Sequence, residues 1–219
     1  MGADLQGCYD TAALTEQYSY VYGAVGIHPE CAKELPENWL TVLRELLKKE
    51  KIVAVGEIGL DYHWLDSCPK ERQQEVFSTQ LELSRELSLP VAVHDREAHA
   101  DTLEFLRRYR PQGVVHCFSG SVEMAREVVK LGMYVGIGGV VTFKNARHAV
   151  EVAKELPLDR LLLETDAPYM APEPYRGKRN DSSLILHVAK RIGELRGEAP
   201  EVILQAAGEN TRRLFRLPS

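Results

Sequence analysis

Short apolar runs alternate with longer amphipathic stretches along the whole chain, and this alternation restricts the possible folds more than any other feature. The short runs are rich in Val, Ile, Leu and Ala, as is typical of strands that are buried on both faces. Strands that alternate with helices indicate βαβ units and a parallel sheet. We expect strands at Val21–Ile27, Ile52–Glu57, Pro90–His94, Gly113–Phe118, Met133–Gly138 and Arg160–Thr165.

The amphipathic stretches between these runs predict helices. In Glu37–Lys49 the apolar residues recur with helical spacing, so that they lie on one face. Ser121 has the residue type and position of an N-cap for the helix that follows it. Pro200 suits the first turn of the last helix. The sequence contains no internal repeat, linker or low-complexity tract, and we expect one domain over residues 1–219.

Two α/β architectures fit this pattern, a doubly wound sheet and a (β/α)8 barrel. No strand is followed by a GxGxxG motif or a P-loop, because Gly136, Gly138 and Gly139 match neither. Polar residues follow many different strands, as in barrel enzymes, whereas a doubly wound enzyme gathers them at one switch point. The sequence therefore favours an α/β fold of the (β/α)8, TIM-barrel type.

The composition and the termini restrict the class of protein. The net charge of −5 disfavours a protein that wraps nucleic acid through bulk attraction, but it allows a nuclease with one basic cleft. The four cysteines lie far apart without a CxxC pair, which indicates reduced thiols. The chain has neither a signal-peptide pattern nor an apolar run of the roughly 18 residues that a spanning helix needs. We expect a soluble cytoplasmic protein.

Histidines and carboxylates occur at the ends of several expected strands. In a barrel such side chains converge on one mouth, and imidazole nitrogens with carboxylate oxygens suit zinc, manganese, iron or magnesium. Two metals bridged by a carboxylate would clamp a phosphodiester and activate water. The set comprises His28, Glu57, Asp61, His94, His116, Glu164 and Asp166.

Each of these residues also has a structural interpretation. A single histidine at a strand end is commonly only a hydrogen-bonded structural residue. Glu57 lies inside an apolar run, so its buried carboxylate needs a cation or a hydrogen-bond donor. Asp166 precedes Ala167-Pro168 and could cap a turn, while Asp61 and Glu164 could orient ligands. The remaining histidines read as surface residues, and His99 alone is near enough to the expected mouth to stay a candidate. They are His63, His99, His148 and His187.

A basic loop follows the strand that ends near Asp166. Its segment from Pro172 to Asn180 contains Arg176, Lys178 and Arg179. Guanidinium and ammonium groups suit phosphate recognition, and Tyr175 could stack on a base or a sugar. The alternative is a solvated basic loop without a ligand.

Together the motifs GIHP, GEIGLDY, VHDREAH, HCFSG, ETDAPYMAP, PYRGKRN and ENTRRLFRL resemble, in this order, those of the TatD family. The resemblance implies a (β/α)8 barrel of the amidohydrolase type and a divalent-metal phosphodiesterase acting on DNA. By motif, Glu57 would reach both metal positions, and His94 and His116 would be ligands of one metal. Asp166 would be a ligand and would activate water. His28 would contact a substrate phosphate, and Arg176 and Arg179 would lie near the nucleic-acid backbone. The metals would be magnesium, manganese or zinc.

The sequence departs from the family at its start. Family members begin with a strand that ends in a His-x-His pair, and no such pair occurs here. MGADLQG resembles the end of the family's second strand and the loop after it. The sequence thus resembles an N-terminally truncated barrel with about six of eight strands, which a start at an internal Met or a natural truncation would explain equally. We expect one weak metal site and weak or absent nuclease activity. The alternatives are a disabled fragment or binding scaffold, and a related amidohydrolase acting on small esters, amides or lactones.

Overall fold

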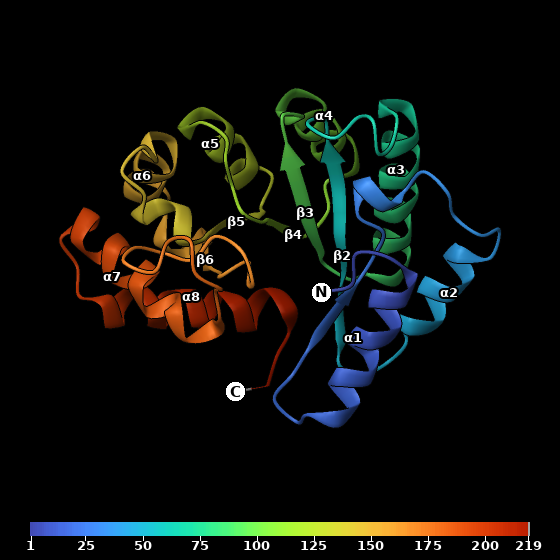
Figure 1. The fold of residues 1–219 in the computed structure, drawn as a ribbon, viewed down its shortest axis with the longest axis horizontal. Helices are drawn as coiled ribbons and strands as arrows, with labels where there is room; N and C mark the ends of the chain where they lie inside the picture. The colour runs from blue at the N-terminus through green and yellow to red at the C-terminus, as the bar shows by residue number, and fades with distance from the viewer. Residues whose placement is uncertain (219) are drawn as a thin grey trace. The chain divides into compact units, whose positions relative to one another are not determined.

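The structure is a computed structural model that describes residues 1–218. Contacts within the chain divide it into two compact units, Met1–Gly113 and Val114–Ser219. We describe each unit by itself (Figure 1).

The first unit is a parallel β-sheet with helices packed on it. Its strands pair in the order β1-β2-β3, and α1 packs against β1 while α3 packs against β2 (Figure 1). The strands are β1 (Gly23–Val25), β2 (Ile52–Asp61) and β3 (Val91–Arg96). The helices are α1 (Leu5–Gln17), η1 (Pro29–Cys31), α2 (Trp39–Leu46), α3 (Lys70–Leu87) and α4 (His99–Tyr109).

Helix α3 combines an apolar face with two buried glutamines. Phe77 and Leu81 are each 1% exposed, and they lie on the same buried side as Gln73 and Gln80. Gln80 pairs with both backbone groups of Ile27, accepting from its N–H over 2.7 Å and donating to its carbonyl over 3.0 Å. Gln73 pairs in the same way with the backbone of Asp61, over 2.8 Å in each direction. The helix therefore fixes the chain where β1 leads into His28 and where β2 ends.

The second unit also contains three parallel strands, paired in the order β4-β5-β6. Asn210 of α8 donates from Nδ2 to the carbonyls of Leu158 and Leu161, each over 2.8 Å, and so fixes the start of β6. The strands are β4 (Gly113–Val115), β5 (Tyr134–Ile137) and β6 (Leu161–Leu163). The helices are α5 (Val122–Lys130), η2 (Gly139–Thr142), α6 (Arg147–Glu155), η3 (Leu158–Arg160), η4 (Ser182–Leu184), α7 (Ile185–Arg196) and α8 (Pro200–Phe215).

All six expected strands are present, but several of their ends differ from the prediction. The second strand continues past Glu57 to Asp61, because Ile58 and Leu60 are fully buried and its pairing with β3 continues there. His94 lies inside β3, which continues to Arg96, rather than at its last residue. His116 follows β4 rather than lying within it. Glu57 and His94 are therefore presented from extended strands rather than from loops.

The predicted helix signals are confirmed. Ser121 caps α5 by accepting from the N–H of Met124 over 3.3 Å, and Pro200 opens α8. In the described residues no helix is long and apolar enough to cross a membrane.

The expectation for the first residues is partly wrong. The chain is already helical from Leu5, because Asp4 accepts from the N–H of Gly7 over 2.7 Å and caps α1. Gly2 and Ala3 do run beside the first strand, where the Gly2 N–H donates to Ala24 O and Ala3 O accepts from His28 N–H. The strand-like part of the segment is thus limited to these residues.

Candidate metal centre

Three predicted site residues of the first unit lie together. His28, Glu57 and His94 each offer a ligand atom, and these atoms all lie within 4.8 Å of one another. Oε1 of Glu57 lies 3.4 Å from Nε2 of His28 and 3.0 Å from Nδ1 of His94. The Glu57 side chain is 17% exposed, so the group is accessible without lying on the open surface. Two imidazoles and one carboxylate form a donor set that fits a divalent transition metal.

The backbone around this group is fixed by hydrogen bonds. The His28 N–H donates to Ala3 O over 2.8 Å, and the preceding residue is held by Gln80. The Glu57 N–H donates to Gly2 O over 3.2 Å. Residues 2–3 therefore support two of the three side chains, a role that the sequence did not predict.

Asp61 holds the imidazole of His94. Its Oδ2 lies 2.9 Å from His94 Nε2, and its Oδ1 accepts from the N–H groups of His63 and Trp64. Burial is the largest single influence and opposes ionisation of Asp61, but His94, the His63 N–H and Arg96 together hold the pKa of this carboxyl below its ordinary value. A buried carboxylate on the second nitrogen of a ligand histidine fixes its orientation and raises its basicity. Asp61 thus has the contacts of an orienting residue.

The second unit carries a separate group of ligand atoms. His116, Cys117 and Glu164 bring one atom each within 4.8 Å of the others. Glu164 accepts from the Cys117 N–H and lies 3.9 Å from Nδ1 of His116. Burial raises the pKa of Glu164, while His116 and the Cys117 N–H act in the opposite direction. Gly136 makes room for this carboxylate, because a Cβ there would lie 2.5 Å from its Oε2.

Asp166 lies near Cys117 but outside that group of three. Burial raises the pKa of the Cys117 thiol, and the carboxylates of Glu164 and Asp166 raise it further. The Asp166 backbone has a φ of 56°, and its carbonyl accepts from the N–H of Tyr169 over 2.9 Å. The turn that the Ala-Pro pair suggested is therefore present, and it holds the Asp166 side chain near His116–Cys117. Cys117 was not predicted as a ligand, although it directly follows His116 in the HCFSG motif.

The basic loop is tied to the Asp166 turn. Asn180 is 2% exposed and donates from Nδ2 to the carbonyls of Thr165 and Tyr169, each over 2.6 Å. The guanidinium of Arg176 lies over the ring of Phe143 at 4.4 Å, and the Tyr175 ring meets His187 edge-on at 5.1 Å. Arg179 is exposed. The C-terminal end of the loop is therefore fixed to the Asp166 turn by Asn180, while its outer side carries exposed charge.

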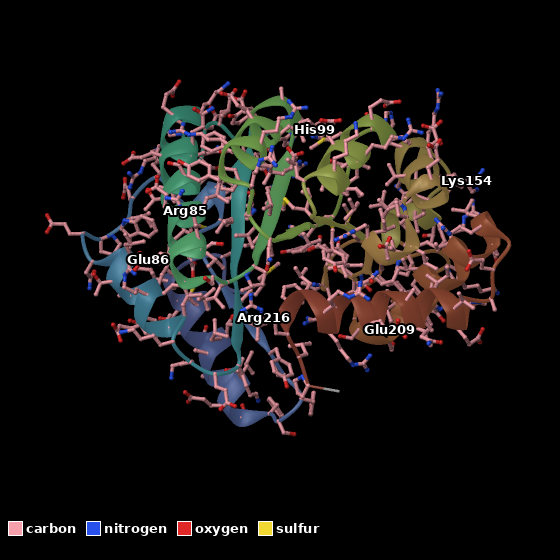
Figure 2. All side chains as sticks on the ribbon, turned by 180° about the vertical axis from the view of Figure 1, so that it is seen from behind. Arg85, Glu86, His99, Lys154, Glu209 and Arg216 are labelled. Carbon is pink, nitrogen blue, oxygen red and sulfur yellow. The ribbon has the colours of Figure 1, made fainter. Side chains whose placement is uncertain are left out.

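The remaining histidines have local partners or lie on the surface. His99, labelled in Figure 2, begins α4 and lies with Nδ1 2.7 Å from the buried Asp95, which raises the pKa of His99. His63 is exposed beside Glu97, and His148 is exposed on α6. His63 and His148 are therefore surface residues, as the sequence indicated.

Comparison with known proteins identifies the family. The sequence profile described as TatD related DNase matches residues 1–216. The metal-dependent hydrolase YabD of Bacillus subtilis is 46% identical over 207 residues, which cover 93% of this chain and 81% of that protein. The protein of Erwinia billingiae named 3'-5' ssDNA/RNA exonuclease TatD is 38% identical, covering 94% of this chain and 81% of its own length.

A solved structure agrees with this assignment. The crystal structure of YJJV, a TatD homologue from Escherichia coli K12, superposes with a TM-score of 0.93 and 37% identity, covering 99% of this chain and 85% of that one. The α/β fold class expected from the sequence is therefore confirmed. The chain belongs to the TatD family of metal-dependent hydrolases.

Proposed function

We propose that the chain is a divalent-metal-dependent phosphodiesterase that cleaves DNA. The observation that carries the proposal is the His28–Glu57–His94 group, in which two histidines meet one carboxylate and the buried Asp61 orients His94. Such a second contact on a histidine is typical of metal sites and is of less use in a purely structural ion pair. Membership of a family described as TatD related DNase supports the substrate class.

In this proposal the metal ligands are Glu57, His94, His116 and Asp166. The bound ion would supply a Lewis acid that polarises a phosphoryl oxygen. The Asp166 carboxylate accepts the proton of the attacking water, since a general base acts from within hydrogen-bond reach of its substrate. His28, whose Nε2 lies 3.4 Å from Glu57 Oε1 beside these ligands, contacts the substrate phosphate rather than the metal in this proposal.

The basic loop supplies the other substrate contacts of the proposal. Arg176 and Arg179 pair with phosphate oxygens, for which the planar guanidinium is suited. The Tyr175 ring meets that of His187 on α7 edge-on, and in this proposal it stacks on a base or sugar. Charge gathered in one loop accounts for nucleic-acid binding by a chain of net charge −5.

The test is hydrolysis of a single-stranded DNA oligonucleotide with manganese or magnesium supplied. Asp166→Asn removes a charge with little change of volume, and we expect it to reduce the rate at least 100-fold. Asp159→Asn is the matched control, because Asp159 is a 67% exposed carboxylate in the same unit, and it should leave the rate unchanged. Equal rates in the wild type and Asp166→Asn, or hydrolysis of lactones or esters in place of DNA, would contradict the proposal.

A further inference from the structure

The second unit contains a cavity beside its candidate ligands. Its volume is about 230 Å³, and it lies where β4 and β5 end and α6 begins. Phe118 and Val141 form apolar walls that are 5% and 0% exposed, and Val140 and the partly exposed Met170 complete them. Asn145 and Arg147 line the rim. Cys117, which is adjacent to His116 in the chain, also lines the cavity.

The wall made by η2 is fixed by close backbone packing. A Cβ on Gly139 would lie 2.0 Å from Met170 O, so only glycine permits this approach. Thr142 donates to Gly139 O over 2.7 Å and accepts from the Glu173 N–H over 2.8 Å. These bonds join the cavity wall to the start of the basic loop.

The basic loop places positive charge next to this apolar space. Phe143, which follows η2, carries the Arg176 guanidinium over its ring at 4.4 Å. Arg147 at the rim adds a second guanidinium, with its Nε 2.9 Å from Glu151 Oε1. An apolar slot with adjacent cations complements a ligand that joins a flat ring to a phosphate.

We propose that this cavity, the Phe118 pocket, binds one base of a single-stranded nucleic acid whose phosphates lie along the basic loop. The inference rests on the proposed function and adds a base-binding subsite to it. Apolar walls accept the faces of a base without strong sequence preference, while the few polar groups at the rim meet its edge. Asn145 offers both a donor and an acceptor for that edge.

The test is an abasic scan of a labelled six-nucleotide single-stranded DNA. Binding to the full chain is measured by fluorescence anisotropy with calcium in place of magnesium, and the oligonucleotide is checked for integrity afterwards. An abasic site removes the base but keeps the phosphates. We expect one position at which loss of the base weakens binding about ten-fold, and little effect elsewhere.

Two variants link that position to the pocket. Val140→Trp fills the space. We expect this variant to bind the intact oligonucleotide about as weakly as the wild type binds the abasic one. Removing the base should then cause no further loss of affinity in the variant. Val202→Trp is the control, because Val202 is 44% exposed on α8, outside the pocket lining. Circular dichroism checks the fold of each, and Val140→Leu, a smaller increase in volume, replaces Val140→Trp if that chain does not fold.

The outcomes separate this inference from the proposed function. Binding that is insensitive to every abasic position, or sensitivity that persists when the pocket is filled, would overturn the base subsite while leaving phosphodiester hydrolysis intact. No binding of any oligonucleotide would overturn both.

Discussion

Oδ2 of Asp61 lies 2.9 Å from Nε2 of His94, between the last residue of β2 and the paired strand β3. The same imidazole lies with Nδ1 3.0 Å from Oε1 of Glu57. His94 is thus held between two carboxylates, one fully buried and one partly exposed. This arrangement separates the orienting role of Asp61 from the ligand role that we propose for Glu57.

Asp61→Asn should weaken binding of manganese about 10- to 100-fold, because the ring of His94 loses its charged partner. Isothermal titration of the purified chain measures the affinity. Asp66→Asn, in the exposed loop that follows β2, is the matched control and should bind as the wild type does. An unchanged affinity in Asp61→Asn would show that Asp61 stabilises only the loop after β2, through the N–H groups of His63 and Trp64, and does not support metal binding.

Gln80→Met should destabilise the chain by about 1–3 kcal/mol, because it leaves the buried N–H and carbonyl of Ile27 without their side-chain partner. Urea denaturation measures the change in the free energy of unfolding. Gln205→Met, at an exposed position on α8, should change it by less than about 0.5 kcal/mol. If the two variants are equally stable, the hydrogen bonds of Gln80 make no net contribution to the free energy of unfolding.

Asp101→Asn should lower stability at pH 7 by about 1 kcal/mol. The contact with Lys70 Nζ at 2.6 Å, together with the hydroxyl of Tyr62, holds the pKa of Asp101 below its ordinary value of 3.8. A lowered pKa stabilises the folded chain above the unfolded pKa, and this contribution is lost as the pH falls through the folded pKa. The difference in unfolding free energy between the variant and the wild type should therefore begin to shrink as the pH falls below about 3.8 and vanish at still lower pH. Urea denaturation at several pH values measures this difference. A gap that persists at low pH would contradict this account.

Addition of an N-terminal strand with a His-x-His pair should raise the rate of DNA hydrolysis, since no such pair occurs in the 219 residues. The resemblance to the family assigns these imidazoles to a metal position, and a second ion stabilises both the attacking and the leaving oxygen. A version of the same added strand with both histidines replaced by alanine is the control. Equal rates for the two would show that the pair is dispensable.

The apolar runs predicted the strands well, because burial on both faces leaves a clear signal in residues such as Val55, Val93 and Val135. The end of β2 was placed too early, because a carboxylate at Glu57 resembles a strand end when its partner strand is unknown. Gln73 and Gln80 could not be recognised, since glutamine on a helix is usually exposed. Their partners lie 12 and 53 residues away, and only the fold brings them together.

The candidate site was predictable to a similar extent. The strand-end pattern named His28, Glu57 and His94, and these residues lie together in the first unit, while their roles stay predictions. Cys117 and Glu164 form the corresponding group of the second unit with His116, and Cys117 was missed because it was considered only as a free thiol. The assignment of Glu57, His94, His116 and Asp166 to one shared metal site stays a prediction.

The rate of manganese-dependent hydrolysis of single-stranded DNA by the wild type and by Glu57→Gln tests the central claim most directly. Glutamine keeps the size of the side chain but removes the charge that holds the ion. We predict a weak rate for the wild type that EDTA abolishes, and a rate for Glu57→Gln that does not exceed the EDTA background. The same manganese-dependent rate in both proteins would contradict the account.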